Sequence, residues 1–91
     1  MTGDSFEIAW TATSRRALSR LPEKVGAAVV ELCYGPLAEN PARLGKPLRF
    51  ELEGLHSARR GDYRIIYRID HGRHRVEIVA IEHRSAAYRA R

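Results

Sequence analysis

Cysteine, lysine and long apolar runs are almost absent from this 91-residue chain. Its single cysteine, Cys33, excludes an intrachain disulfide and any zinc site built from several cysteines. No apolar run approaches the roughly 18 residues of a membrane span, and residues 1–6 lack the basic-then-apolar pattern of a secretory signal. We therefore expect a cytoplasmic protein with no membrane partner.

What the chain does contain is typical of one globular domain. The residues are 44% apolar and 30% charged, a balance found in folded domains and not in disordered segments. A chain near this length buries roughly two-thirds of its unfolded surface on folding. We predict a single domain over residues 1–91, so that any active site lies on the surface of one compact unit.

The basic residues are nearly all arginine, because Lys24 and Lys46 are the only lysines among 16 basic side chains. Residues 1–42 carry four basic and five acidic side chains, whereas residues 43–91 carry twelve and six. This asymmetry favours a polyanionic partner, either nucleic acid or an acidic protein. A solvated basic surface and the arginine enrichment of a high-GC genome are the alternatives.

The first half of the chain predicts a strand and two helices. Residues 6–10 alternate apolar and polar, as in a strand with one buried face. Thr11 and Thr13 are candidate caps for a helix over residues 14–21, and Pro22 suits the first turn of the next helix.

An apolar stripe follows one face of that second helix, at Val25, Val29, Leu32 and Cys33. Gly35-Pro36 ends or bends it, and residues 38–54 predict a loop with at most a short extended piece.

The second half switches to the period of strands. We predict strands over residues 55–60, 63–69 and 75–81, with turns at Gly61-Asp62 and at residues 70–72 and a polar tail over residues 82–91. Together these elements predict an α+β fold with an N-terminal strand, a helical hairpin and a three-stranded antiparallel meander. The helices pack on one face of the sheet. On the open face Arg64, Ile66 and Arg68 share one side of the middle strand, either as an RNA platform or as an ordinary solvated surface.

Several kinds of chemistry have little support in this sequence. The histidines at positions 56, 71, 74 and 83 lack acidic partners at a metal-binding spacing, and we predict no metal and no cofactor. Neither a phosphate-binding glycine motif nor GxSxG occurs. Cys33 lies on the apolar stripe, which favours a core residue over a nucleophile.

Arginines, histidines and a tyrosine can nevertheless cleave RNA without a metal. The 2′-hydroxyl of RNA is an internal nucleophile, so the protein must align it, take its proton, stabilise the phosphate and protonate the leaving 5′ oxygen. An arginine fork matches two non-bridging phosphate oxygens, and histidine moves protons at neutral pH. DNA lacks the 2′-hydroxyl and would not be cut by the same residues.

The sequence resembles the RelE/ParE toxin superfamily, on GKPL at residues 45–48, ELEGL at 51–55, RRGDYRIIY at 59–67, and HR at 83–84 followed by YR at 88–89. The resemblance covers essentially the whole chain and is greatest to the RelE branch, including the RelE-like proteins of mycobacteria and other actinobacteria. It implies the toxin of a type II toxin–antitoxin system, acting as a metal-independent endoribonuclease that cleaves mRNA in the ribosomal A site. The products would be a 2′,3′-cyclic phosphate and a 5′-hydroxyl.

The implied partners are a RelB-like cognate antitoxin and mRNA on the ribosome, with operator DNA bound only by the toxin–antitoxin complex. The resemblance also assigns catalytic roles. Arg64 would stabilise the transition state, unless it pairs with a carboxylate across the sheet. Arg84 would help the leaving group, and Tyr88 would stack on a base or aid proton transfer, unless it anchors the tail. His83 is a candidate general base or an ordinary edge-strand histidine.

Phosphate binding is the role expected of Arg59, Arg60 and Arg68, although ordinary surface charge explains them as well; His56 is a lesser candidate for proton transfer. The sequence departs from the RelE pattern at residues 55–60, where two family lysines are missing. Lys46 lies nearby, but its glycine–proline setting favours a structural loop. Either His83 or Tyr88 replaces the missing base, or the enzyme is slow, or cleavage has been lost. The alternative functions are a ParE-like toxin that binds DNA gyrase, and an inactive homologue that binds only its antitoxin.

Overall fold

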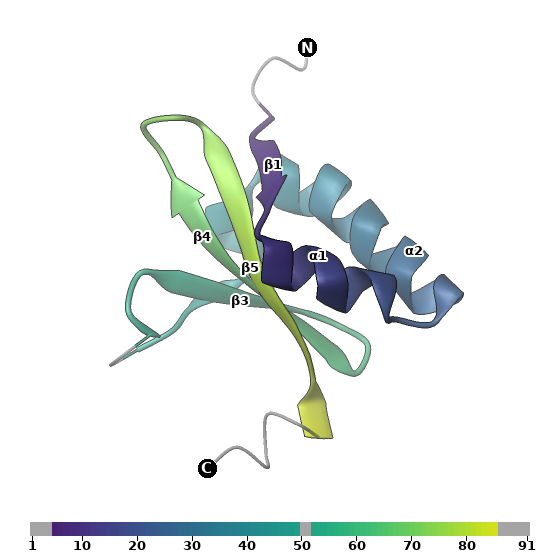
Figure 1. Cartoon of the computed structure of the whole chain (residues 1–91). Coiled ribbons are helices and arrows are strands. Elements are labelled where there is room, and N and C mark those ends of the chain that lie inside the picture. The colour runs from purple at the N-terminus through teal and green to yellow at the C-terminus, as the bar shows by residue number, and fades with distance from the viewer. Residues whose placement is uncertain (1–4, 50–51, 86–91) are drawn as a thin grey trace.

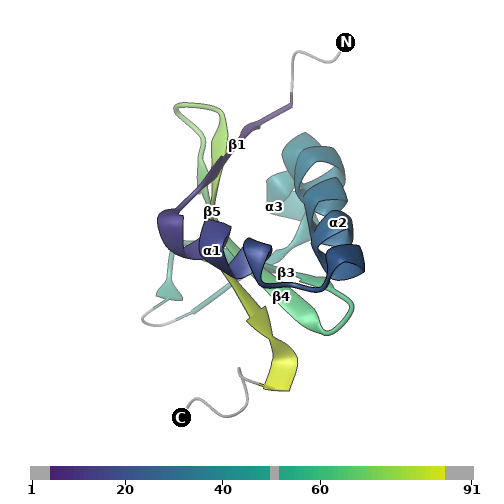
Figure 2. The same ribbon diagram turned by 45° about the vertical axis from the view of Figure 1, so that its right-hand side comes forward.

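A computed structural model describes residues 5–49 and 52–85. Its elements are β1 (Glu7–Trp10), α1 (Ala12–Ser19), α2 (Glu23–Leu32), the π-helical turn η1 (Cys33–Leu37), α3 (Pro41–Leu44), β2 (Lys46–Pro47), β3 (Leu55–Arg60), β4 (Tyr63–Asp70) and β5 (Arg75–His83). Figures 1 and 2 show α1 and α2 on the same side of the sheet. Within the described residues no helix is both long and apolar enough to cross a membrane.

The predicted α+β architecture and its meander are confirmed, and the sheet is larger than the meander alone. Five strands lie in the order β1-β5-β4-β3-β2, so β4 is the middle strand. The β3–β4 and β4–β5 pairs are antiparallel, whereas β1 runs parallel to β5 and starts with Glu7 opposite Arg75. The hairpin between β3 and β4 turns at Gly61, whose φ of 60° suits a residue without a Cβ.

The helical hairpin forms where the sequence predicts it. Thr11 caps α1 by accepting a hydrogen bond from the Ser14 backbone N–H at 3.0 Å, and Pro22 immediately precedes α2. Gly35-Pro36 does not end the second helix, because the chain continues through it as η1. The wider π turn accommodates a proline ring that would clash with the preceding turn of an α-helix.

The core lies between the helices and the sheet. Fully buried side chains from α2 and η1 meet those of β4 and β5; the largest are Tyr67, Leu37, Ile65, Ile78, Val29 and Val76. Cys33 is buried in the same cluster, as its place on the apolar stripe predicts. Burial raises the pKa of its thiol to about 12, so the group stays protonated and inert at neutral pH.

The helix-free face is less open than the alternation predicts. Ile66 points to this face but is only 6% exposed. It lines a hollow of about 250 Å³ together with Leu48, Leu52, Leu55 and Ala80. Apolar side chains, including those of Leu48 and Leu52, therefore surround the centre of this face.

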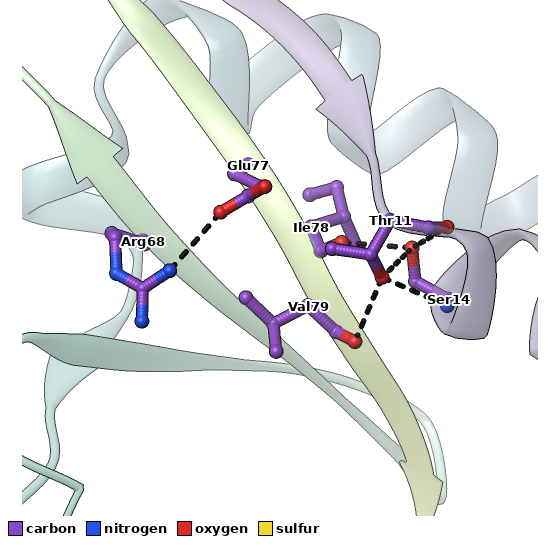
Figure 3. Close-up of polar contacts among 6 residues, drawn as sticks. All are labelled: Thr11, Ser14, Arg68, Glu77, Ile78 and Val79. Carbon is purple, nitrogen blue, oxygen red and sulfur yellow. Dashed lines mark hydrogen bonds and ion pairs between the residues drawn. The ribbon is translucent and has the colours of Figure 1, made fainter.

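A β-bulge interrupts β5 next to Ile66. Ile66 pairs with Ala80 and Tyr67 with Ile78, so Val79 is an extra residue. The Thr11 side chain donates a hydrogen bond to the Val79 carbonyl at 3.2 Å, and Ser14 donates to the Ile78 carbonyl at 2.7 Å (Figure 3). The start of α1 thus satisfies backbone acceptors at the bulge.

Candidate functional site

A groove of about 620 Å³ lies where β2, β3 and β4 meet. Three cationic side chains line it, those of Lys46, Arg59 and Arg64, and no acidic residue of the described ranges does. A concave surface lined by one sign of charge concentrates its field and favours an anionic ligand.

Strand register brings these three side chains to one face. Arg59 on β3 is the direct partner of Arg64 on β4, and Lys46 on β2 is the partner of Ser57 on β3. Directly opposed residues share a side of the sheet, and so do residues two apart on one strand. Lys46, Arg59 and Arg64 consequently all lie on the face without helices.

Gly45 allows β2 to approach this closely. A Cβ at position 45 would collide with the Tyr67 hydroxyl and the Ser57 carbonyl. The Tyr67 hydroxyl donates a hydrogen bond to the Pro41 carbonyl at 2.7 Å, and burial raises its pKa to about 12. Tyr67 is therefore a neutral structural group that holds the segment carrying Lys46 against the sheet.

Arg64 is held by Glu82, its partner across β4 and β5, with 2.9 Å between Nη2 and Oε1. The Arg64 side chain is 34% exposed, and its Nε is buried with no hydrogen-bond partner in the part of the chain that the structure describes. The pairing with a carboxylate anticipated from the sequence is thus present. Because Arg64 also lines the groove, it is both fixed in orientation and adjacent to the space where an anion would bind.

Arg68 lies on the same face but nearer the other end of β4. Its Nη1 is 3.0 Å from Oε1 of Glu77 on β5, an exposed ion pair drawn in Figure 3. Arg68 does not line the groove that Arg59 and Arg64 share. It follows Arg64 by four residues along β4, on the far side of Ile66, and so lies outside the cationic cluster.

Arg60 and His83 lie on the opposite face, toward the helices. Arg60 pairs with Tyr63, and Tyr63 in turn pairs with His83. The rings of Tyr63 and His83 meet edge to face with 5.0 Å between their centroids, and His83 Nδ1 lies 2.8 Å from the Ser85 hydroxyl. The sheet itself therefore separates this imidazole from Arg64.

Arg84 lies just beyond β5, against the turn between β3 and β4. Its backbone N–H donates to the Asp62 carbonyl at 2.8 Å, and its guanidinium is 3.6 Å from the Asp62 carboxylate. Both side chains are 63% exposed, so this ion pair is easily exchanged for a ligand. Tyr88, the remaining predicted catalytic residue, lies outside the described residues.

His56 faces the core side of β3 and stacks on Tyr67, with ring centroids 5.5 Å apart. Burial and then the nearby charge of His71 lower its pKa, which favours the neutral imidazole. This places His56 away from the groove. No group of three or more His, Cys, Asp or Glu side chains among residues 5–49 and 52–85 could hold a metal ion.

Lys46 is the groove residue that the sequence interpretation missed. Gly45-Lys46-Pro47 predicts a structural loop, and the segment instead forms a short strand that presents the lysine next to two arginines. The signal available in the sequence was the glycine, which marks a close backbone approach.

The fold and the comparisons together define the class. Residues 8–88 match the family described as the ParE toxin of type II toxin–antitoxin systems, parDE. The isolated RelE toxin of Escherichia coli, at 10% identity, has the same fold with a TM-score of 0.73, covering 87% of this chain and 84% of that one. The chain belongs to the RelE/ParE toxin family and is the toxin of a type II toxin–antitoxin system.

Named mycobacterial toxins are similar over nearly the whole chain. Toxin RelE of Mycobacterium tuberculosis (strain ATCC 25618 / H37Rv) is 66% identical over 84 residues, which cover 92% of this chain and 87% of the relative. Toxin RelG of the same strain is 49% identical, covering 92% and 97%. The toxin–antitoxin complex RelBE2 from M. tuberculosis matches with a TM-score of 0.85 and 48% identity over 89% of this chain and 93% of the matched chain. The resemblance to RelE proteins is confirmed.

Proposed function

We propose that this toxin is a metal-independent endoribonuclease that cleaves mRNA in the ribosomal A site. The observation that carries the proposal is the groove that Lys46, Arg59 and Arg64 line, with no acidic lining residue in the part of the chain that the structure describes. The RelE and RelG names of its mycobacterial relatives support the same direction. Inhibition of translation follows from loss of the message during decoding.

The reaction requires no group beyond side chains and the RNA. The 2′-hydroxyl attacks the adjacent phosphorus, the bond from phosphorus to the 5′ oxygen breaks, and a 2′,3′-cyclic phosphate and a 5′-hydroxyl result. Negative charge accumulates on the non-bridging oxygens in the transition state. Arg64, oriented by Glu82 and bordered by Arg59, is placed to stabilise that charge.

Proton transfer is assigned to the end of β5 and the tail. The 2′-hydroxyl proton goes to His83 or Tyr88, and the leaving 5′ oxygen receives a proton with help from Arg84. The base must lie within hydrogen-bond reach of the 2′-hydroxyl beside the phosphate that Arg64 binds. His83 lies on the far face from Arg64, which favours Tyr88 over His83 for this step. Arg60 and Arg68 then act as outlying phosphate contacts.

The proposed partner is a RelB-like antitoxin, because a similar chain occurs in the RelBE2 toxin–antitoxin complex of M. tuberculosis. We expect operator DNA to be bound only by the complex of the two proteins. A cognate antitoxin that covers the basic half of the toxin would associate at a rate that falls as salt rises.

Gyrase inhibition is the second candidate, favoured by the match to the ParE toxin family over residues 8–88. A toxin of that kind needs a binding surface and no acid–base residues. An inactive antitoxin binder is the third, since Arg64 is already paired with Glu82.

Induction of the chain in a bacterial host separates the three. Primer extension is run on a translated message and on the same message without its start codon. Ribosome-dependent cleavage gives cuts only in the translated message, and Arg64→Ala lowers the cleavage rate about 100-fold to 1,000-fold. Arg73→Ala, at an exposed ion pair in the β4–β5 turn, is the matched control and leaves the rate unchanged.

Growth arrest without cuts, together with loss of supercoiling by purified gyrase, would transfer the assignment to a ParE-like toxin. Neither arrest nor cuts would identify an antitoxin binder.

A further inference from the structure

Lys46 reaches the cationic groove from a different strand than the two arginines. It lies on β2, is exposed, and stands opposite Ser57, two residues before Arg59. Strands lie about 4.8 Å apart and residues rise about 3.3 Å along each strand. The Lys46 backbone is thus two strands away from Arg64, and both residues line the same groove.

The backbone beneath Lys46 is fixed on both sides. Gly45 is packed against Tyr67 and Ser57 with no room for a Cβ. Beyond Pro47, the Leu48 N–H donates a hydrogen bond to the Leu55 carbonyl at 2.8 Å. The ammonium therefore samples only the reach of its own side chain, from a rigid base.

The charges along the groove differ in how far they are neutralised. Arg64 has Glu82 as its partner, whereas Lys46 and Arg59 have no ion pair among the described residues. The groove consequently carries surplus positive charge on the β2–β3 side, away from the arginine assigned to the reacting phosphate. A single RNA strand crossing the groove would place a neighbouring phosphate there.

We propose that Lys46 is a substrate-binding residue that contacts an RNA phosphate next to the one being cleaved. This rests on the proposed function and extends it: β2 supplies, from outside the meander, a lysine to a groove whose β3 strand contributes only arginine, since residues 55–60 contain no lysine. The contact positions the RNA so that its 2′-hydroxyl is aligned for attack on the phosphate bound by Arg64.

The test measures binding without cleavage. Ribosomes are programmed with an mRNA that carries a 2′-deoxynucleotide at the attacking position, so that the toxin binds but cannot cut. Lys46→Ala is expected to weaken binding about 10-fold to 100-fold, as loss of one charge-assisted contact does. Lys46→Arg retains most of the affinity. Lys24→Ala, the exposed lysine of α2, is the matched control and binds like the wild type.

Neutral methylphosphonates, placed one at a time around the A-site codon, identify the phosphate. At one position, the methylphosphonate should weaken RNA binding by the wild type by the same factor as the Lys46→Ala substitution does. The same methylphosphonate should not weaken binding by Lys46→Ala any further, because both changes remove the same contact. Additive losses at every position, or unchanged binding by Lys46→Ala, would overturn the contact. If Arg64→Ala still lowers the cleavage rate about 100-fold or more in those cases, the proposed function stands. A wild type that neither binds nor cuts programmed mRNA overturns both proposals.

Discussion

The two faces of β4 have the same backbone and opposite chemistry. Toward the helices, Ile65 and Tyr67 are fully buried and hold the core together. On the other side, Arg64 and Arg68 each pair with a glutamate on β5 and remain partly exposed. The comparison teaches that stability and function are separable here, because adjacent residues of one strand serve one or the other.

Truncation on the core face should have the largest effect. Ile65→Ala removes a fully buried side chain and is expected to lower the free energy of unfolding by about 2–5 kcal/mol. Chemical denaturation followed by circular dichroism measures it. A loss under about 1 kcal/mol would mean that the core collapses around the gap and that the contrast between the faces is weaker than the burial indicates.

Gly45→Ala tests the link between the faces, because Gly45 lies where β2 packs on Tyr67. The added Cβ collides with the Ser57 backbone and with the Tyr67 hydroxyl, which is held by its hydrogen bond to Pro41. We therefore expect the free energy of unfolding to fall by about 1–3 kcal/mol, and RNA binding to weaken because Lys46 is displaced. Gly72→Ala is the control, since its Cβ would have its nearest neighbour at 3.6 Å. Equal effects of both substitutions in thermal melts and binding assays would contradict the account.

Alkaline pH should weaken the core side through Cys33. Its pKa is about 12 in the folded protein and 9.0 in a free thiol, so the unfolded chain loses the proton first. Stability from this group is complete below pH 9 and falls as pH rises through the window to 12, by at most about 1.4 kcal/mol per pH unit. Chemical denaturation of the wild type and of Cys33→Ala between pH 8 and 11 should show that the difference between their free energies of unfolding becomes smaller as pH rises. Parallel curves would contradict it.

The smallest effect is expected at the exposed pair on the helix-free face. Arg68→Ala should cost less than about 1 kcal/mol, because an exposed ion pair is screened by water and salt. A double-mutant cycle with Glu77→Ala should give a coupling of about 0.2–1 kcal/mol that declines as salt is added. A larger, salt-independent coupling would show that this face also contributes to stability.

Local patterns were sufficient to predict most of the fold. The alternation at residues 63–69 placed β4 and both of its faces, and Gly61 placed the turn before it. The parallel pairing of β1 with β5 was not predictable, because it joins segments at opposite ends of the chain. The bulge at Val79 also left no signal, since four consecutive apolar residues at positions 78–81 conceal where the alternation breaks.

The candidate site was predicted in its chemistry and only partly in its geometry. Arg59 and Arg64 lie together as their hairpin spacing implies. Lys46 was missed because only tertiary packing converts its glycine–proline loop into a strand. His83 was grouped with Arg64 on the basis of a motif, which carries no information on the face of the sheet that each residue occupies.

The single extra residue in β5 decides which side chain Arg64 meets. If the ladder ran in phase from the Tyr67–Ile78 pair, Arg64 would stand opposite Ile81, and Glu82 would turn toward the helices. Because of the bulge, the even-numbered residues of β5 after Val79 lie on the helix-free face, so the Arg64 guanidinium has the Glu82 carboxylate beside it instead of the Ile81 side chain. Thr11, which satisfies the bulge carbonyl, therefore helps a helix on one side of the sheet to select the electrostatic neighbour of an arginine on the other.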